Sequence, residues 1–251
     1  MNKPYSFPYG KTTQTASLPE TCIQAVIESD LSSYRPPLGP EETVKYALAN
    51  PHDTTELSVL AKSCKTVTVI TSDHTRPMPS QITMPLLLQE IRKGNPDAQI
   101  TILIATGCHR KTTQKELTER FGETIVKQEH IVVHNCDEGP FCQIGTSPSG
   151  NHIELNQIAC EADLLIAEGF IEPHFFAGFS GGRKSILPGV ASRKTIMYNH
   201  AACNIHDPHS ISGILEGNPV HEDMLFAAKA SGIRFILNVI LNQNKEIIGA
   251  V

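Results

Sequence analysis

Apolar runs rich in β-branched residues alternate along this chain with segments of helical periodicity. Residues 66–70 (TVTVI), 99–105 (QITILIA) and 163–167 (DLLIA) predict buried strands. Residues 80–93 and 112–121 follow the helical spacing, and the second segment opens on a threonine cap with Glu116 nearby. Because such alternation is typical of parallel α/β architecture, we predict an open, mostly parallel sheet flanked by helices, similar to a Rossmann fold.

The remaining segments complete one predicted α/β domain over residues 1–251. Residues 131–134 and 234–241 read as further strands, and a helix is expected from Ser192 to about His200. The polar and proline-rich stretches 34–42 and 136–151 are typical of surface connections, the second with room for a hairpin. After a turn at 242–245, residues 246–251 begin a strand that stops while still apolar. Since a natural domain rarely ends within a hairpin, we expect a truncated chain or an isolated domain.

Charge and hydropathy exclude several classes of partner. The net charge is -5 and no strongly basic block occurs, so a nucleic-acid-binding surface is not expected. No apolar run reaches the length of a membrane span, and the first fourteen residues lack the apolar core of a signal peptide. We therefore expect a cytoplasmic protein without membrane contact.

The seven cysteines are scattered and form no CxxC pair. A disulfide framework or a structural zinc knuckle is therefore not expected, and most of the thiols are interpreted as small buried hydrophobic groups. Cys108 is the exception, because it stands between Gly107 and His109 in a loop that has other signs of chemistry.

One glycine-rich run, EPHFFAGFSGGRKSILPG at residues 172–189, has the composition of an anion-binding loop. Glycines allow sharp turns and close approach of the backbone to a ligand, while Arg183 and Lys184 add positive charge. Lys184 is followed by an apolar stretch, and a partly desolvated lysine is the usual kind that bonds covalently to a cofactor. The run therefore predicts a cofactor-binding loop.

Four histidines occur in turns or loops expected near the ligand-binding edge of the sheet, namely His74, His109, His174 and His200. His109 and His174 share their loops with Arg110 and the glycine-rich run, and two such groups could act as acid and base on one substrate. The alternative for each histidine is a capping or packing role. Asp73 and Arg76 either bind ribose hydroxyls and an anionic group or pair with each other as turn residues.

A zinc site is a further alternative for the histidines. His200, His206 and His209 supply three imidazoles, although their spacing is not a standard zinc signature. His200 alone, as one protein ligand to a metal that a cofactor otherwise holds, fits the sequence better.

Four motifs in order resemble the nickel-dependent lactate racemase family. They are SDHTRPMPS at 72–80, ATGCHR at 105–110, EPHFFAGFSGGRKSILPGV at 172–190 and MYNH at 197–200. The resemblance covers essentially the whole chain but only the N-terminal portion of the family, whose C-terminal domain closes the active-site cleft.

The resemblance implies a nickel pincer nucleotide, the nickel complex of a pyridinium-3,5-bisthiocarboxylic acid mononucleotide. It implies that Lys184 forms the covalent tether, that His200 is the protein ligand to nickel, and that Asp73 contacts the cofactor. Arg76 would orient the substrate and also contact the cofactor, and His109 and His174 would be the acid/base pair. The cofactor phosphate would lie on Ser180, Gly181 and Gly182, which agrees with the anion-binding composition of that loop.

The implied reaction is racemisation or epimerisation of a 2-hydroxy acid through a 2-oxo acid. Direct loss of the α-proton is unfavourable beside a carboxylate, so the family moves a hydride while one histidine takes the hydroxyl proton. Proteins that make and insert the cofactor are implied as partners, and a preparation without them is expected to lack it. Two alternatives are a non-catalytic domain fragment and a zinc metallohydrolase that uses the histidine cluster.

Overall fold

The described chain divides into two compact units. A computed structural model describes residues 1–10, 12–26, 31 and 34–251, and the units are Met1–Tyr34 and Arg35–Val251. The first unit holds the antiparallel strands β1 (Asn2–Tyr9) and β2 (Thr12–Pro19), followed by the short helix η1 (Glu20–Cys22). The α/β fold expected for residues 1–251 is built from the second unit.

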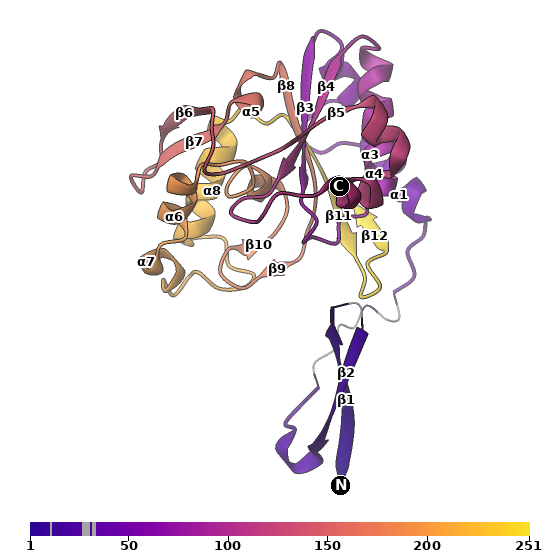
Figure 1. The fold of residues 1–251 in the computed structure, drawn as a ribbon, viewed down its shortest axis with the longest axis vertical. Coiled ribbons are helices and arrows are strands. Elements are labelled where there is room, and N and C mark those ends of the chain that lie inside the picture. Colours follow the sequence, from indigo (N-terminus) through magenta and orange to yellow (C-terminus); the bar gives the residue numbers. More distant parts are fainter. Residues whose placement is uncertain (11, 27–30, 32–33) are drawn as a thin grey trace. The chain divides into compact units, whose positions relative to one another are not determined.

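The second unit is organised around a six-stranded sheet of order β12-β11-β8-β3-β4-β5 (Figure 1). Neighbouring strands pair in parallel except at one edge, where β12 runs antiparallel to β11. The bounds are β3 Thr66–Ser72, β4 Gln99–Ala105, β5 His130–Val133, β8 Leu164–Phe170, β11 Phe235–Leu241 and β12 Ile247–Ala250. The predicted open, mostly parallel sheet is thus confirmed.

Both faces of the sheet are covered, because its central strands β8, β3 and β4 are apolar on both sides. Ile102 and Ile104 of β4 pack into one core, whereas Leu103 between them packs into the other. Figure 1 shows α1, α3 and α4 on one side of the sheet and α6 and α8 on the other. The helices are α1 Pro40–Ala49, α2 Leu57–Ala61, α3 Ser80–Gly94, α4 Gln114–Gln128, α5 Gln157–Glu161, α6 Arg193–Asn199, α7 Ala202–Ile205 and α8 Pro219–Ala230.

Helix α4 begins later and ends later than the sequence predicts. Its N-cap is Thr113, whose hydroxyl accepts from the Glu116 amide while the Glu116 carboxylate accepts from the Thr113 amide. Gly122, at φ 79°, interrupts the helix with a kink, and the second part runs on to Gln128. A glycine inside a periodic segment looks like an end in the sequence, which explains the shorter prediction.

The smaller elements lie in the connections between strands. The hairpin expected within 136–151 is formed by β6 (Phe141–Thr146) and β7 (His152–Asn156), so its second strand extends beyond that stretch. The glycine-rich run forms the two-residue strands β9 (Pro173–His174) and β10 (Gly178–Phe179), then the short helix η3 (Gly182–Ser185). In the part of the chain that the structure describes, no helix is long and apolar enough to cross a membrane.

Candidate active site

A cleft of about 570 Å³ opens at the carboxyl ends of β3, β4 and β8, where ligands of open α/β sheets bind. Its lining includes residues from all four sequence motifs. Those predicted from the sequence are Asp73, Arg76, His109, His174, Ser180, Gly181, Lys184 and His200. Gly182, also predicted, is not part of the lining.

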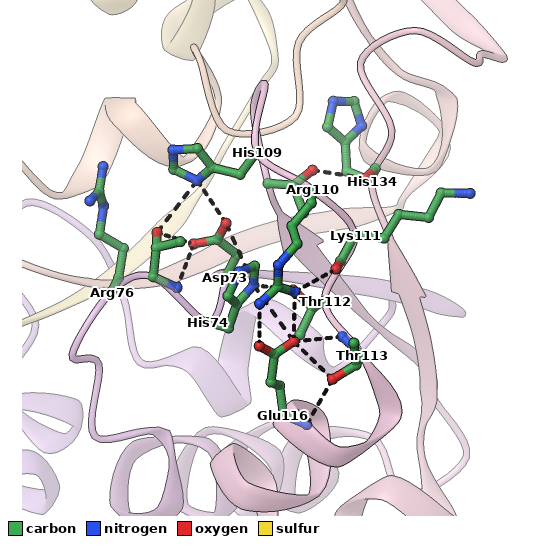
Figure 2. A network of polar contacts seen from close by, with 12 residues as sticks. Asp73, His74, Arg76, His109, Arg110, Lys111, Thr112, Thr113, Glu116 and His134 are labelled. Atoms are coloured by element: carbon green, nitrogen blue, oxygen red, sulfur yellow. Dashed lines mark hydrogen bonds and ion pairs between the residues drawn. The ribbon is translucent and has the colours of Figure 1, made fainter. Parts of the chain in front are cut away.

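Asp73 and His109 form a hydrogen-bonded pair between the loops after β3 and β4. The buried Asp73 carboxylate accepts from His109 Nδ1 at 2.8 Å (Figure 2). Its other oxygen, Oδ1, accepts from the Thr75 amide at 3.1 Å and the Thr75 hydroxyl at 2.6 Å. With Nδ1 donating to a carboxylate, the lone pair of a neutral His109 ring lies on Nε2, as a general base requires.

Arg76 lies on the same loop as Asp73, and Arg120 of α4 donates hydrogen bonds to the backbone of this loop. The Arg120 guanidinium donates at 2.6 Å to the carbonyls of both Asp73 and Arg76. Burial lowers the pKa of Arg120, while the carboxylates of Glu168 and Asp73 oppose that shift. Arg76 itself is exposed, so its guanidinium is available to an anionic ligand.

His174 lies on β9 among aromatic side chains and cations. Its ring stacks on Phe175 with centroids 4.8 Å apart, and Nδ1 accepts from the Ala177 amide at 3.3 Å. Burial, and then the charges of Lys184 and Arg76, lower the pKa of His174 to about 4. The imidazole is therefore neutral near pH 7.

Lys184 lies on η3 in an environment that disfavours its charged form. Burial, Arg183 and Arg76 together lower the pKa of the Lys184 amine to about 7. Its Nζ lies 5.9 Å from the centre of the Phe176 ring. A large fraction of this amine is therefore unprotonated and nucleophilic at neutral pH.

The loop from Ser180 to Gly182 is held by several internal hydrogen bonds. The Ser180 hydroxyl donates to the Phe170 carbonyl at 2.8 Å, and the Gly182 amide donates to Asn238 Oδ1 at 3.2 Å. At Gly181, φ is +78° and an added Cβ would lie 2.8 Å from Asn238 Oδ1, so glycine is needed there. The backbone at Gly181 thus lines the cleft. The Ser180 hydroxyl and the Gly182 amide, both expected to bind phosphate, already have protein partners.

His200 follows the last residue of α6 and is half-buried. Burial and the charge of Lys184 lower its pKa to about 4, so the ring is neutral. Its Nδ1 is a buried polar atom for which the described residues provide no hydrogen-bond partner. A neutral imidazole with an unsatisfied buried nitrogen has the properties of a metal ligand.

The three-histidine zinc site is wrong. Among the described residues, which include His200, His206 and His209, no group of three or more His, Cys, Asp or Glu side chains could hold a metal ion. His209 is exposed and bonds to Asp207 at 3.0 Å, away from the cleft lining. His74 also lies outside this lining, with its Nδ1 3.1 Å from the Thr112 hydroxyl.

Sequence reasoning missed two charged residues near the cleft, Arg120 and Glu168. Glu168 is fully buried in β8 and accepts hydrogen bonds from three hydroxyl groups, those of Thr71 (2.6 Å), Ser80 (2.5 Å) and Thr83 (2.5 Å). A glutamate directly after the apolar run 164–167 was a usable signal for Glu168. Arg120 gives no such signal, because it resembles any charged residue of an exposed helix face.

Comparison with known proteins identifies the family. Residues 9–213 match the model of the lactate racemase N-terminal domain. The chain belongs to this lactate racemase family. A lactate racemase from Thermoanaerobacterium thermosaccharolyticum is 52% identical over 97% of the chain and 57% of the relative. One from Lactiplantibacillus plantarum is 47% identical over 97% of the chain and 58% of the relative.

Solved structures support the same fold. The lactate racemase apoprotein from T. thermosaccharolyticum superposes with a TM-score of 0.88 at 50% identity, covering 99% of this chain and 58% of that one. A Thermotoga maritima protein shares the fold alone, with a TM-score of 0.69 at 22% identity over 87% of this chain and 55% of that one. The chain thus spans somewhat more than half the length of the lactate racemases that it matches.

Proposed function

We propose that this chain is the cofactor-holding part of a racemase or epimerase of 2-hydroxy acids, with lactate as the first substrate to test. The observation that supports it most is the presence of Asp73–His109, His174, Lys184 and His200 around one cleft. An acid/base pair, a nucleophilic amine and a neutral imidazole together suit a covalently held metal cofactor and a substrate that exchanges a hydroxyl proton.

The residues present fit the nickel pincer nucleotide that the family resemblance implies. Lys184 would hold it covalently, since its amine has a pKa lowered to about 7 by burial and neighbouring cations. His200 would be the protein ligand to nickel, because its buried Nδ1 has no partner among the described residues. When bound, the cofactor would supply a site that accepts a hydride from the α-carbon of the substrate and returns it.

The remaining side chains provide binding and proton transfer. Arg76 would bind the substrate carboxylate through charge-assisted hydrogen bonds. His109 Nε2 would take the hydroxyl proton, while the hydrogen bond from Nδ1 to the buried Asp73 carboxylate fixes the orientation of the ring. His174 would serve the opposite enantiomer, so that the substrate passes through a 2-oxo acid and gains hydrogen on either face.

The test is racemisation of L-lactate and D-lactate by this chain joined to the C-terminal part of the T. thermosaccharolyticum relative. The cofactor-making and inserting proteins that the resemblance implies as partners are produced in the same cells. Substitutions His109→Gln and His174→Gln are each expected to reduce turnover about 10²- to 10⁴-fold, because each removes a general acid or base. Nickel content should remain, since neither residue is proposed to bind the metal.

His130→Gln is the matched control, because His130 is exposed on β5 and outside the cleft lining. It should leave racemisation unchanged. Intact-mass measurement should show an added mass that Lys184→Ala removes. Near-normal turnover in either His109→Gln or His174→Gln, or an added mass on another residue, contradicts the assignment. Residues 1–251 without the added C-terminal part are assayed in parallel. Racemisation by this chain would show that it is active alone, and no racemisation that it is a non-catalytic fragment.

A further inference from the structure

Two thiols lie in contact at the edge of the cleft and have no part in the proposed catalysis. Cys108 Sγ and Cys136 Sγ are 3.9 Å apart. The residues follow the neighbouring parallel strands β4 and β5, which brings their loops together. Cys108 is exposed and lines the cleft, whereas Cys136 is 4% exposed and packs in the core.

We propose that Cys108 and Cys136 form a reversible oxidation site, which a hydroperoxide converts to a disulfide with displacement of the adjacent His109. This modification goes beyond racemisation. Its formation is independent of the proposed function, and only its effect on catalysis rests on that function.

The chemistry takes place in two steps. The Cys108 thiolate attacks hydrogen peroxide, so an S–O bond forms, the O–O bond breaks and the leaving hydroxide takes up a proton to give water. Cys136 sulfur then attacks the Cys108 sulfenic acid, so the S–S bond forms, the S–O bond breaks and the Cys136 proton leaves with the hydroxide as a second water. Two thiols are oxidised and one peroxide is reduced.

The surroundings of the two sulfurs favour this order of events. Cys108 is open to solvent, so a small oxidant reaches it first. Burial, and then the neighbouring Cys108, raise the pKa of the Cys136 thiol to about 11. Cys136 therefore stays protonated near pH 7, so the first attack on peroxide falls to Cys108.

Disulfide formation would move the Cys108 loop rather than Cys136. Sulfur atoms in a disulfide lie about 2 Å apart, so the 3.9 Å separation must shorten. The Cys136 carbonyl accepts from the Arg193 amide at 2.8 Å, and its side chain is buried in the core. His109 follows Cys108 directly, and its 2.8 Å hydrogen bond to Asp73 would be disturbed.

The chain contains a natural control pair, Cys142 and Cys160. These thiols also interact with each other, but both are only half-buried and neither lines the cleft. Burial, together with the neighbouring Cys142, raises the pKa of the Cys160 thiol to about 12. Cys203 is exposed and reports general reactivity toward oxidant.

The experiment treats the chain with equimolar hydrogen peroxide, alkylates the remaining thiols and maps peptides by mass spectrometry with and without a reducing thiol. We expect two of the seven thiols to be lost as one linked Cys108–Cys136 peptide, leaving five alkylated. Dithiothreitol should restore both. Cys136→Ser should leave an oxidised but unlinked Cys108, whereas Cys142→Ser should not change the linkage. Retention of both thiols while Cys203 is oxidised, or linkage of Cys108 to another cysteine, would overturn the proposal.

Proton NMR of the His109 imidazole tests the displacement separately from activity, with His109→Gln to assign the signal. Oxidation should shift the signal in the unsubstituted chain and leave it in place in Cys136→Ser. A disulfide that forms without moving this signal would overturn the coupling to His109. If the racemase proposal were wrong, by contrast, the expected peptide map and NMR spectrum would be unchanged.

Discussion

Side chains in the cleft depend on their surroundings for their chemical state. Lys184 and His174 both have lowered pKa values, with burial as the largest cause in each case. Arg76 and Lys184 contribute to the shift of His174, while Arg183 and Arg76 contribute to that of Lys184. A neutral imidazole and an amine that is in large part unprotonated at neutral pH therefore coexist beside permanent guanidinium charges.

The Lys184 amine should react with acylating reagents at much lower pH than an ordinary lysine. Its unprotonated fraction rises through a pKa of about 7, so labelling should approach its maximum near pH 8. Lys45 is the control, because a hydrogen bond to Glu41 raises its amine pKa. Competitive labelling of the chain, followed by peptide mapping, measures both. Equal pH dependence of the two residues would contradict the environment described for Lys184.

The cysteines show that composition does not predict the burial of individual residues. Most were expected to be buried, yet only Cys64 and Cys136 are buried, while Cys22, Cys108 and Cys203 are exposed. All seven are free in the structure. Average burial of a residue type does not tell which individual thiols lie in loops, or that the Cys108 and Cys136 loops meet.

Helix α4 links the fold to the cleft at the scale of the element. Its capping box fixes where the helix begins, and Arg110 reaches the same Glu116 carboxylate at 2.6 Å (Figure 2). One turn after Glu116, Arg120 donates to the carbonyls of Asp73 and Arg76. The helix thus supports the loop that contains both the Asp73–His109 pair and Arg76.

Arg120→Ala should destabilise the chain by about 2 kcal/mol, because it leaves partly buried carbonyls without a charged donor. Lysine lacks the planar guanidinium group, so Arg120→Lys should recover only part of the lost stability. Urea denaturation measures both. The His109 NMR signal should also shift, since the loop that presents Asp73 loses its support. Lys127→Ala on the same helix is the control, because its ion pair with Glu123 is exposed. An Arg120 effect no larger than the Lys127 effect contradicts this role.

Sequence patterns predicted the elements of the sheet well but their polar contacts poorly. The strand at 99–105 was predicted with its observed bounds, since its apolar run is long and uninterrupted. The four sequence motifs contributed eight predicted residues to the lining of one cleft. The Asp73–His109 hydrogen bond and the Arg120 contacts join residues 36 to 47 positions apart, and no local pattern encodes such pairs. Gly182 was assigned to the cofactor phosphate from the family resemblance and the composition of its loop, and its amide donates to Asn238 Oδ1, a contact that neither signal predicts.

At the scale of the molecule, the Arg35–Val251 unit has two cores separated by one sheet. Ile102 and Leu103 are neighbours in β4, both fully buried, and pack on opposite faces. Because β3, β4, β5 and β8 each contribute side chains to both cores, we expect the sheet and its helices to unfold together.

Ile102→Ala and Leu103→Ala should each cost about 2–5 kcal/mol, since each removes a fully buried side chain from a different core. Urea denaturation measures the loss in the free energy of unfolding. Far-ultraviolet circular dichroism and tyrosine fluorescence, neither of which needs a tryptophan, monitor the transition. A single transition that shifts alike for both variants is expected. Separate transitions, one for each core, would contradict cooperative unfolding.

The two arginines that brace the cleft loops have a thermodynamic consequence for ligand binding. Arg120 ties together the carbonyls of Asp73 and Arg76, and Arg183 ties those of Ala177 and Phe179 in the same manner. Each loop therefore loses much of its conformational freedom during folding, before any ligand arrives. A ligand that enters the cleft meets preorganised walls, so little of its binding free energy is spent on ordering the chain.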